Sequence, residues 1–231
     1  MIYVMSDIHG SYEKYMQVFD RIGFNDDDTI FVLGDVVDRG KNPVKVLQDM
    51  MFRANVIPIV GNHEKMALDV LKPLTKIDSE NFPGFDEELL LDLQLWQAVG
   101  GQTTIDEFVV LSQADRENLL EYMGEFELYA EVSCNGKDYI LVHAGLYHFR
   151  ENKALDEYKP NELIWQSIDF DKKYFKDKYI VTGHVPTMSI EANDFESKIY
   201  KVNNHIAIDC GCVFGGYLAV LCLDDEREFY I

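Results

Sequence analysis

Aspartate, asparagine and histidine side chains follow the ends of five apolar runs in this sequence. These residues are Asp7, His9, Asp35, Asn62, His143 and His184. Carboxylate and amide oxygens mixed with imidazole nitrogens suit Mn²⁺, Fe or Zn²⁺. The set offers more ligands than one ion needs, so the sequence predicts a site for two divalent cations.

Each of these positions also has a simpler explanation when it is taken alone. Asp, Asn and Gly are common turn formers after strands. This explanation is weaker for histidine, because four of the six histidines in the chain lie close to a glycine at the end of an apolar run. Five such coincidences are hard to explain by turn chemistry, so we favour the metal site.

Strand and helix patterns alternate over the first 70 residues. Residues 2–6, 29–34 and 55–60 are apolar runs typical of buried strands, and helical spacing predicts helices over 11–22 and 43–53. This order predicts a parallel sheet with right-handed crossovers. Ligands bind at the carboxyl ends of such strands, so the predicted metal ligands should meet at one edge of the sheet.

The middle of the chain has little strand pattern. Helical patterns cover residues 87–99, 103–110 and 114–126, and we interpret residues 65–126 as a helical insertion over the sheet. Its most loop-like part is residues 72–86, which contain both Pro and Gly.

Strand patterns return after residue 126. The Asn135-Gly136 pair predicts a hairpin between 128–134 and 139–142. Further strands are predicted at 179–182, 199–202, 205–209, 217–223 and 228–231. These patterns alone predict a single doubly wound sheet, within one domain that spans residues 1–231.

The formal net charge is −20, from 41 acidic and 21 basic residues. This balance argues against duplex nucleic acid as a partner, because polyanions are bound through Lys and Arg. A phosphate substrate would have to be attracted locally, by metal ions or by a few of the six arginines. The oligomeric state cannot be inferred from these patterns.

The start of the chain lacks the apolar stretch of a signal peptide, and a continuous run of about 18 apolar residues is absent. We therefore expect a cytoplasmic protein without a membrane partner. The cysteines are expected to be reduced thiols of the core. They are Cys134, Cys210, Cys212 and Cys222.

Five strings of the chain, in this order, resemble the metallophosphoesterase (calcineurin-like) superfamily. They are SDIHG at 6–10, GDVVDRG at 34–40, GNHE at 61–64, HAG at 143–145 and GH at 183–184. The complete GDVVDRG and GNHE strings are similar to the serine/threonine phosphoprotein phosphatases of bacteria and phages.

This resemblance implies an α/β fold, a β-sandwich of two mixed sheets flanked by helices with the site on one edge. It implies that Asp7 and His9 hold one divalent cation and that Asp35 bridges to a second. The second cation would be held by Asn62, His143 and His184. We expect Mn²⁺ first, with Fe, Zn²⁺ or Mg²⁺ as alternatives.

Two cations can clamp a phosphoryl group and activate a water between them, so that a bridging hydroxide attacks phosphorus in line. His63 is the natural proton donor to the leaving group, and Asp38 would orient it. Arg39 would bind phosphate oxygens as a planar fork. Glu64 is expected to anchor its loop by hydrogen bonds.

One position departs from the pattern that the resemblance implies. A second phosphate-binding arginine should follow Trp165 shortly, and none does. Arg150, Lys172 or Lys173 could replace it. Without this contact, phosphate binding would be weaker, or the substrate would differ from a plain phosphomonoester.

The leading hypothesis is a phosphomonoesterase that acts on phosphorylated serine or threonine in proteins, or on small phosphoesters. A bis(5'-nucleosyl)-tetraphosphatase-like hydrolase is the second hypothesis, although Glu64 stands where such enzymes more often have Asp. A catalytically silent binding scaffold is the third, kept open by the missing arginine.

Three other features are expected to have a structural role and no part in the chemistry. His148 and His205 match no motif and are expected at the surface or in turns. The apolar stripe from Leu89 to Val99 is interpreted as the packing face of the insertion and not as a substrate groove.

Overall fold

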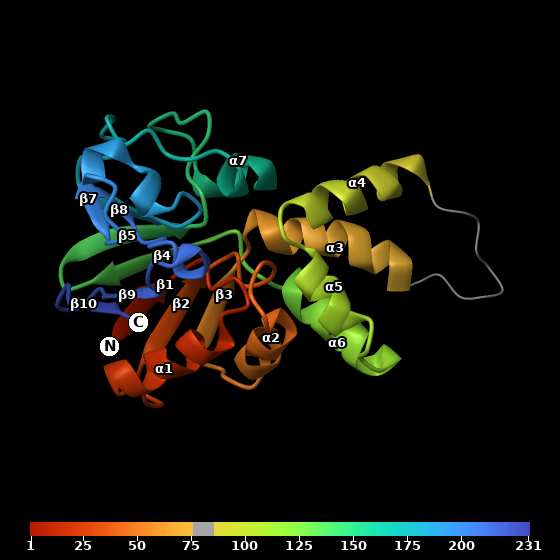
Figure 1. Ribbon diagram of the computed structural model, residues 1–231. Helices are drawn as coiled ribbons and strands as arrows, with labels where there is room; N and C mark the ends of the chain where they lie inside the picture. The colour runs from red at the N-terminus through yellow and green to blue at the C-terminus, as the bar shows by residue number, and fades with distance from the viewer. Residues whose placement is uncertain (76–85) are drawn as a thin grey trace.

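The first sheet contains the strands that open the chain and those that close it. The computed structural model describes residues 1–75 and 86–231, and Figure 1 shows their arrangement. In the order β10-β9-β1-β2-β3, this sheet comprises β10 (Glu228–Tyr230), β9 (Ala219–Cys222), β1 (Ile2–Met5), β2 (Thr29–Leu33) and β3 (Val56–Ile59). β1, β2 and β3 are parallel, whereas β9 and β10 pair antiparallel. Helices α1 (Tyr12–Ile22) and α2 (Pro43–Met51) connect the parallel strands as predicted.

The second sheet is built from the later strands. Its order is β4 (Tyr129–Cys134), β5 (Lys137–Val142), β6 (Lys178–Thr182), β8 (His205–Ala207) and β7 (Tyr200–Val202). β5, β6 and β8 run parallel, and β4 and β7 are antiparallel at the two edges. β4 and β5 form the hairpin that the Asn-Gly turn predicted.

The two sheets form a sandwich around a shared apolar core. Val4 and Leu33 of the first sheet are buried in one cluster with Leu141 and Val181 of the second. The prediction of a single doubly wound sheet is therefore wrong, and the two mixed sheets that the family resemblance implied are confirmed. Local patterns mark a buried strand but do not say which neighbour it pairs with.

The residues interpreted as a helical insertion form helices on one side of the sheets (Figure 1). These are α3 (Asn62–Thr75), α4 (Glu87–Ala98), α5 (Gln102–Phe108) and α6 (Gln113–Gly124). Residues 76–85, most of the predicted loop, lie outside the described residues. α3 begins at Asn62, directly after β3, so two of the predicted site residues lie in its first turn. A short α7 (Pro160–Ile164) follows β5.

His148 and His205 differ from each other in the structure. His148 is exposed and lies 3.1 Å from a Glu162 oxygen, as expected for a surface residue. His205 is only 1% exposed, and its ring packs against Phe170 and Tyr174. The surface prediction for His205 is wrong because a loop distant in sequence covers that part of β8.

The cysteines are free and buried, in agreement with the sequence prediction. Within residues 1–75 and 86–231, the helices are too short or too polar to cross a membrane.

Candidate metal centre

The residues predicted as metal ligands come from loops at the strand ends, where the backbone takes an unusual conformation. Six non-glycine residues of these loops have positive φ: Asp7, His9, Asp35, Asp38, Arg39 and His184. Side-chain sterics disfavour this conformation in most residues, and it concentrates at functional sites. The local backbone therefore turns these side chains toward one edge of the sandwich at some cost in strain.

Asp35 lies at the centre of this edge and presents one oxygen to each side. Its Oδ1 lies 3.4 Å from His143 Nε2, and its Oδ2 lies 3.6 Å from His9 Nε2. Ligand atoms of Asp35, His143 and His184 lie within 4.8 Å of one another, and so do those of Asp35, His9 and His63. A carboxylate that faces two such groups has the arrangement needed to bridge two cations.

Backbone carbonyls orient two of the imidazoles. Nδ1 of His9 lies 2.8 Å from the Val37 oxygen, and Nδ1 of His143 lies 2.7 Å from the Leu33 oxygen. Because a carbonyl only accepts, each Nδ1 carries the proton and each Nε2 turns a lone pair toward Asp35. This arrangement is common among metal-binding histidines.

Asn62, His143 and His184 converge on the Oδ1 side of Asp35. Asn62 Oδ1 lies 3.0 Å from both His143 Nε2 and His184 Nδ1. Asp7 approaches from β1, where its Oδ2 accepts from the His184 N–H at 3.0 Å and from the Ser6 hydroxyl. Asp7 belongs to neither of the two histidine groups, although it is buried beside them.

The buried carboxylates carry an electrostatic cost. Burial raises the pKa of Asp35, and the negative charges of Asp7 and Glu64 raise it further. Burial also raises the pKa of Asp7, with Asp209 adding to the effect. The pKa of Asp209 itself is raised to about 6 by burial. Cations would remove this cost, because an opposite charge favours the ionised carboxyl.

The same site favours the neutral imidazole form of three histidines, His9, His143 and His184. Burial lowers the pKa of His9 and of His143, with Arg39 adding to the effect at His9 and His184 at His143. Burial lowers the pKa of His184 to about 4. Neutral imidazoles and buried carboxylates together are a donor set that fits divalent cations.

His63, Asp38 and Arg39 form a second layer beside Asp35. His63 Nδ1 lies 2.5 Å from Asp38 Oδ2, and its Nε2 lies 2.9 Å from Arg39 Nη2. Arg39 Nη1 also contacts His9 Nε2 at 2.5 Å, and the Phe214 ring lies 5.2 Å from the guanidinium carbon. The structure thus brings the predicted acid, its orienting carboxylate and the predicted phosphate ligand together.

Three residues at this site were not predicted from the sequence. Trp96 and Thr104 donate hydrogen bonds to Asp38 from the helical insertion. Asp209 is buried beside Asp7. A signal existed for Trp96 alone, because a buried tryptophan usually needs a partner for its N–H.

Glu64 anchors the loop around Asp35, as the sequence analysis expected. Its two oxygens accept backbone N–H groups of Asp35, Val36, Val37 and Gly61 at 2.8–3.2 Å. The side chain is completely buried. It therefore ties the start of α3 to the loop after β2.

We expect Glu64→Gln to lower the free energy of unfolding by about 1–3 kcal/mol, because the amide turns a donor toward N–H groups that need acceptors. Urea denaturation measures this effect, with the exposed Glu121→Gln on α6 as the control. Equal stability of the two variants would contradict the anchoring role.

A cavity of about 480 Å³ lies beside the site. Arg39 and His63 line it together with Leu95, Val99 and Trp165. Leu95 and Val99 are 56% and 41% exposed, so the stripe of α4 is not wholly a packing face. This part of the prediction is wrong because the helix turns only one side, which includes the buried Trp96, toward the core.

The described residues that line this cavity do not include the cations proposed to replace the missing arginine, which are Arg150, Lys172 and Lys173. Arg150 lines a different cavity, and Lys172 lies over the rings of Phe149 and Tyr174. Among the described residues that line the cavity beside the site, Arg39 and Lys65 are the cations, and Lys65 is paired with Asp69.

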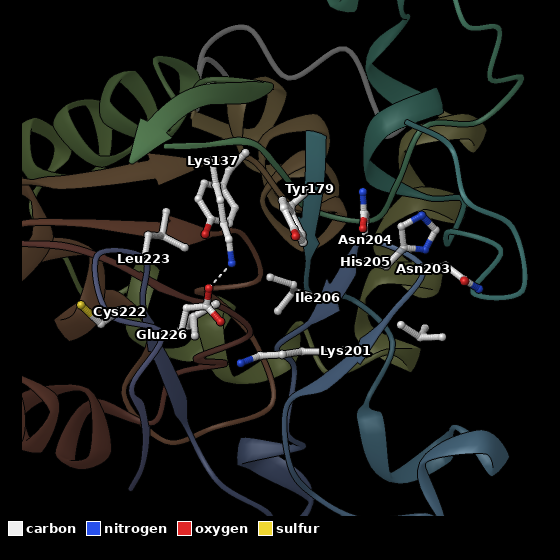
Figure 2. A pocket seen from close by; sticks show the side chains of 13 residues that line it. Lys137, Tyr179, Lys201, Asn203, Asn204, His205, Ile206, Cys222, Leu223 and Glu226 are labelled. Carbon is white, nitrogen blue, oxygen red and sulfur yellow. Dashed lines mark hydrogen bonds and ion pairs between the residues drawn. The ribbon is translucent and has the colours of Figure 1, made fainter. Parts of the chain in front are cut away.

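Figure 2 shows the side chains that line a second cavity, whose volume is about 260 Å³. This cavity lies where strands β5 and β6 begin, at the end opposite to the candidate metal centre. Tyr179 and Lys201 line it, and Lys137 pairs there with Glu226. Strands β5 and β6 begin at this cavity and end at the candidate metal centre. The cavity is therefore separate from the cluster around Asp35.

Comparisons with known proteins find similar hydrolases and phosphatases. The chain is 22% identical to a symmetrical bis(5'-nucleosyl)-tetraphosphatase of Nitrosomonas europaea, over 99% of this chain and 97% of that protein. It is 29% identical to serine/threonine-protein phosphatase 2 of Salmonella typhimurium, over 62% of this chain and 57% of that protein. A solved protein serine/threonine phosphatase from Saccharomyces cerevisiae shares the fold with a TM-score of 0.59 at 15% identity, covering 100% of this chain and 78% of that one.

The family model of the calcineurin-like phosphoesterases matches residues 1–216. Its extent includes all five strings that carried the resemblance, the whole second sheet and strands β1, β2 and β3 of the first. This chain therefore belongs to the calcineurin-like phosphoesterases, a family of metal-dependent hydrolases.

Proposed function

We propose that this protein is a two-metal phosphomonoesterase that removes phosphate from serine or threonine side chains of proteins. The observation that carries the proposal is Asp35, whose two oxygens face two separate groups of imidazoles. In this proposal Asp7 and His9 hold one cation with Asp35. The other is held by Asp35 together with Asn62, His143 and His184.

The bound cations would supply Lewis-acid polarisation of the phosphoryl group and a nucleophilic water. Arg39 binds two phosphate oxygens, and in doing so it must release His9 and His63, which it contacts in this structure. His63 then delivers a proton from Nε2 to the leaving oxygen, while Asp38 holds Nδ1.

A single phosphoryl group suits the charges of this cavity. Among the described residues, Arg39 has no carboxylate partner, whereas Lys65 is paired with Asp69. A chain of several phosphates would need further cations to offset its charge. The exposed side chains of Leu95, Val99 and Trp165 instead offer an apolar wall to the group that carries the phosphate.

A dinucleoside polyphosphate hydrolase is the second candidate. It is favoured by similarity along nearly the full length of both chains to a symmetrical bis(5'-nucleosyl)-tetraphosphatase. Turnover of a phosphoserine peptide, diadenosine tetraphosphate and a bis-aryl phosphate should be compared in one assay. Faster hydrolysis of the tetraphosphate would favour the second candidate.

Removal of metal is expected to abolish hydrolysis of p-nitrophenyl phosphate, and Mn²⁺ should restore it. The ligand set surrounds buried carboxylates that are costly without cations. Initial rates before chelation, after chelation and dialysis, and after addition of each of Mn²⁺, Fe²⁺, Zn²⁺ and Mg²⁺ measure this. Full activity of the chelated, dialysed protein would contradict the two-metal proposal.

A further inference from the structure

Asp38 is surrounded by hydrogen-bond donors from two distant parts of the chain. Its Oδ2 accepts from His63 Nδ1 at 2.5 Å and from Trp96 Nε1 at 2.7 Å. Its Oδ1 accepts from Thr104 Oγ1 at 2.6 Å, and that hydroxyl also accepts the Asp38 N–H at 2.9 Å. Asp38, Trp96 and Thr104 are all at most 1% exposed.

The junction of α4 and α5 is shaped to make these contacts. The Gly100 oxygen accepts the Arg39 N–H at 3.0 Å, and the Val99 oxygen accepts from Arg39 Nε at 3.2 Å. A Cβ on Gly101 would lie 2.6 Å from the Trp96 ring, so only glycine lets the chain turn so closely around the indole. The helical insertion is thus fastened to the loop that carries Asp38 and Arg39.

We propose that Trp96 and Thr104 are positioning residues for proton donation by His63. A carboxylate held by only one donor can rotate, and the imidazole bonded to it would rotate with it. Here Trp96 and Thr104 fix both oxygens of Asp38, so the His63 ring is held with Nε2 toward the substrate side. This inference rests on the proposed function of His63.

Two substrates with different leaving groups distinguish a positioning role of Trp96 and Thr104 from a merely structural one. An alkoxide such as that of serine needs a proton as it departs, whereas 4-nitrophenolate leaves without one. Misplacement of the donor should therefore slow hydrolysis of a phosphoserine peptide and leave p-nitrophenyl phosphate little affected. Loss of fold or of metal would slow both substrates equally.

The principal variant is Thr104→Val, which keeps the shape of the side chain and removes the hydroxyl. We expect kcat for the phosphoserine peptide to fall about tenfold with KM unchanged, and kcat for p-nitrophenyl phosphate to fall less than about twofold. Thr104→Ser should restore the peptide rate, because it returns the hydroxyl. Trp96→Phe should show the same selective loss.

Thr103→Val is the matched control, since the Thr103 hydroxyl is bonded to the Gly100 oxygen and not to Asp38. This variant should lose neither rate. Equal losses on the two substrates in Thr104→Val, or an equal selective loss in Thr103→Val, would overturn the proposal.

A second readout is independent of turnover. In the protein loaded with Zn²⁺, which is diamagnetic, proton NMR should show a downfield, slowly exchanging Nδ1–H of His63, which His63→Asn identifies by its absence. Thr104→Val should broaden or shift this signal, and Thr104→Ser should retain it. An unchanged signal in Thr104→Val would refute the positioning role even if the protein had no phosphatase activity, whereas inactivity of the wild-type protein toward both substrates would refute the proposed function alone.

Discussion

Asp35→Asn is expected to reduce hydrolysis of p-nitrophenyl phosphate by about 10³- to 10⁴-fold, because metal ions contribute several kcal/mol of charge stabilisation in the transition state. Asp35 faces His143 with one oxygen and His9 with the other. An amide has one oxygen and no charge, so it cannot offer a charged oxygen to each cation as the carboxylate does. We expect the variant to retain at most one metal ion per chain.

Elemental analysis of dialysed protein and initial rates at saturating Mn²⁺ measure the two effects together. Asp28→Asn is the matched control, because Asp28 is also buried but is bonded to the N-terminal amine at the other end of the first sheet. The control should keep both metal and activity. Two metal ions per chain in Asp35→Asn, with activity near that of the wild type, would exclude the bridging role.

His63→Asn is expected to lower kcat by about 10²- to 10⁴-fold for a phosphoserine peptide, the usual contribution of a general acid. The metal content should stay the same. This point is critical, because His63 also lies within 4.8 Å of the ligand atoms of His9 and Asp35 and could itself hold a cation. Its Nδ1 is already engaged by Asp38, which favours the acid role.

Single-turnover rates with the peptide and with p-nitrophenyl phosphate, together with metal analysis, distinguish these roles. Loss of proton donation should slow the peptide far more than the aryl ester. Loss of a metal ion should slow both and should appear in the elemental analysis. His148→Asn serves as the control, since His148 is an exposed histidine bonded to Glu162.

The path of the chain before the insertion could be predicted in detail. The first three strands and the two helices between them follow from apolar periodicity, and β1, β2 and β3 are parallel as that order required. The pairing of the remaining strands could not be predicted in this way. β9 and β10 belong to the first sheet, although they follow the strands β4 to β8 of the second sheet along the chain. Both sheets bury the same kinds of apolar side chains, so the sequence pattern does not distinguish their strands.

The candidate site divides in a similar way. The sequence by itself determined the donor types and their places after strand ends, because a short motif specifies both the side chains and the turn that presents them. Only the tertiary structure decided which groups meet. It places the two oxygens of Asp35 beside different histidines. It also brings Trp96 and Thr104, 58 and 66 residues further along the chain, into hydrogen bonds with Asp38. Such contacts depend on how separate elements pack, and that information is absent from any local pattern.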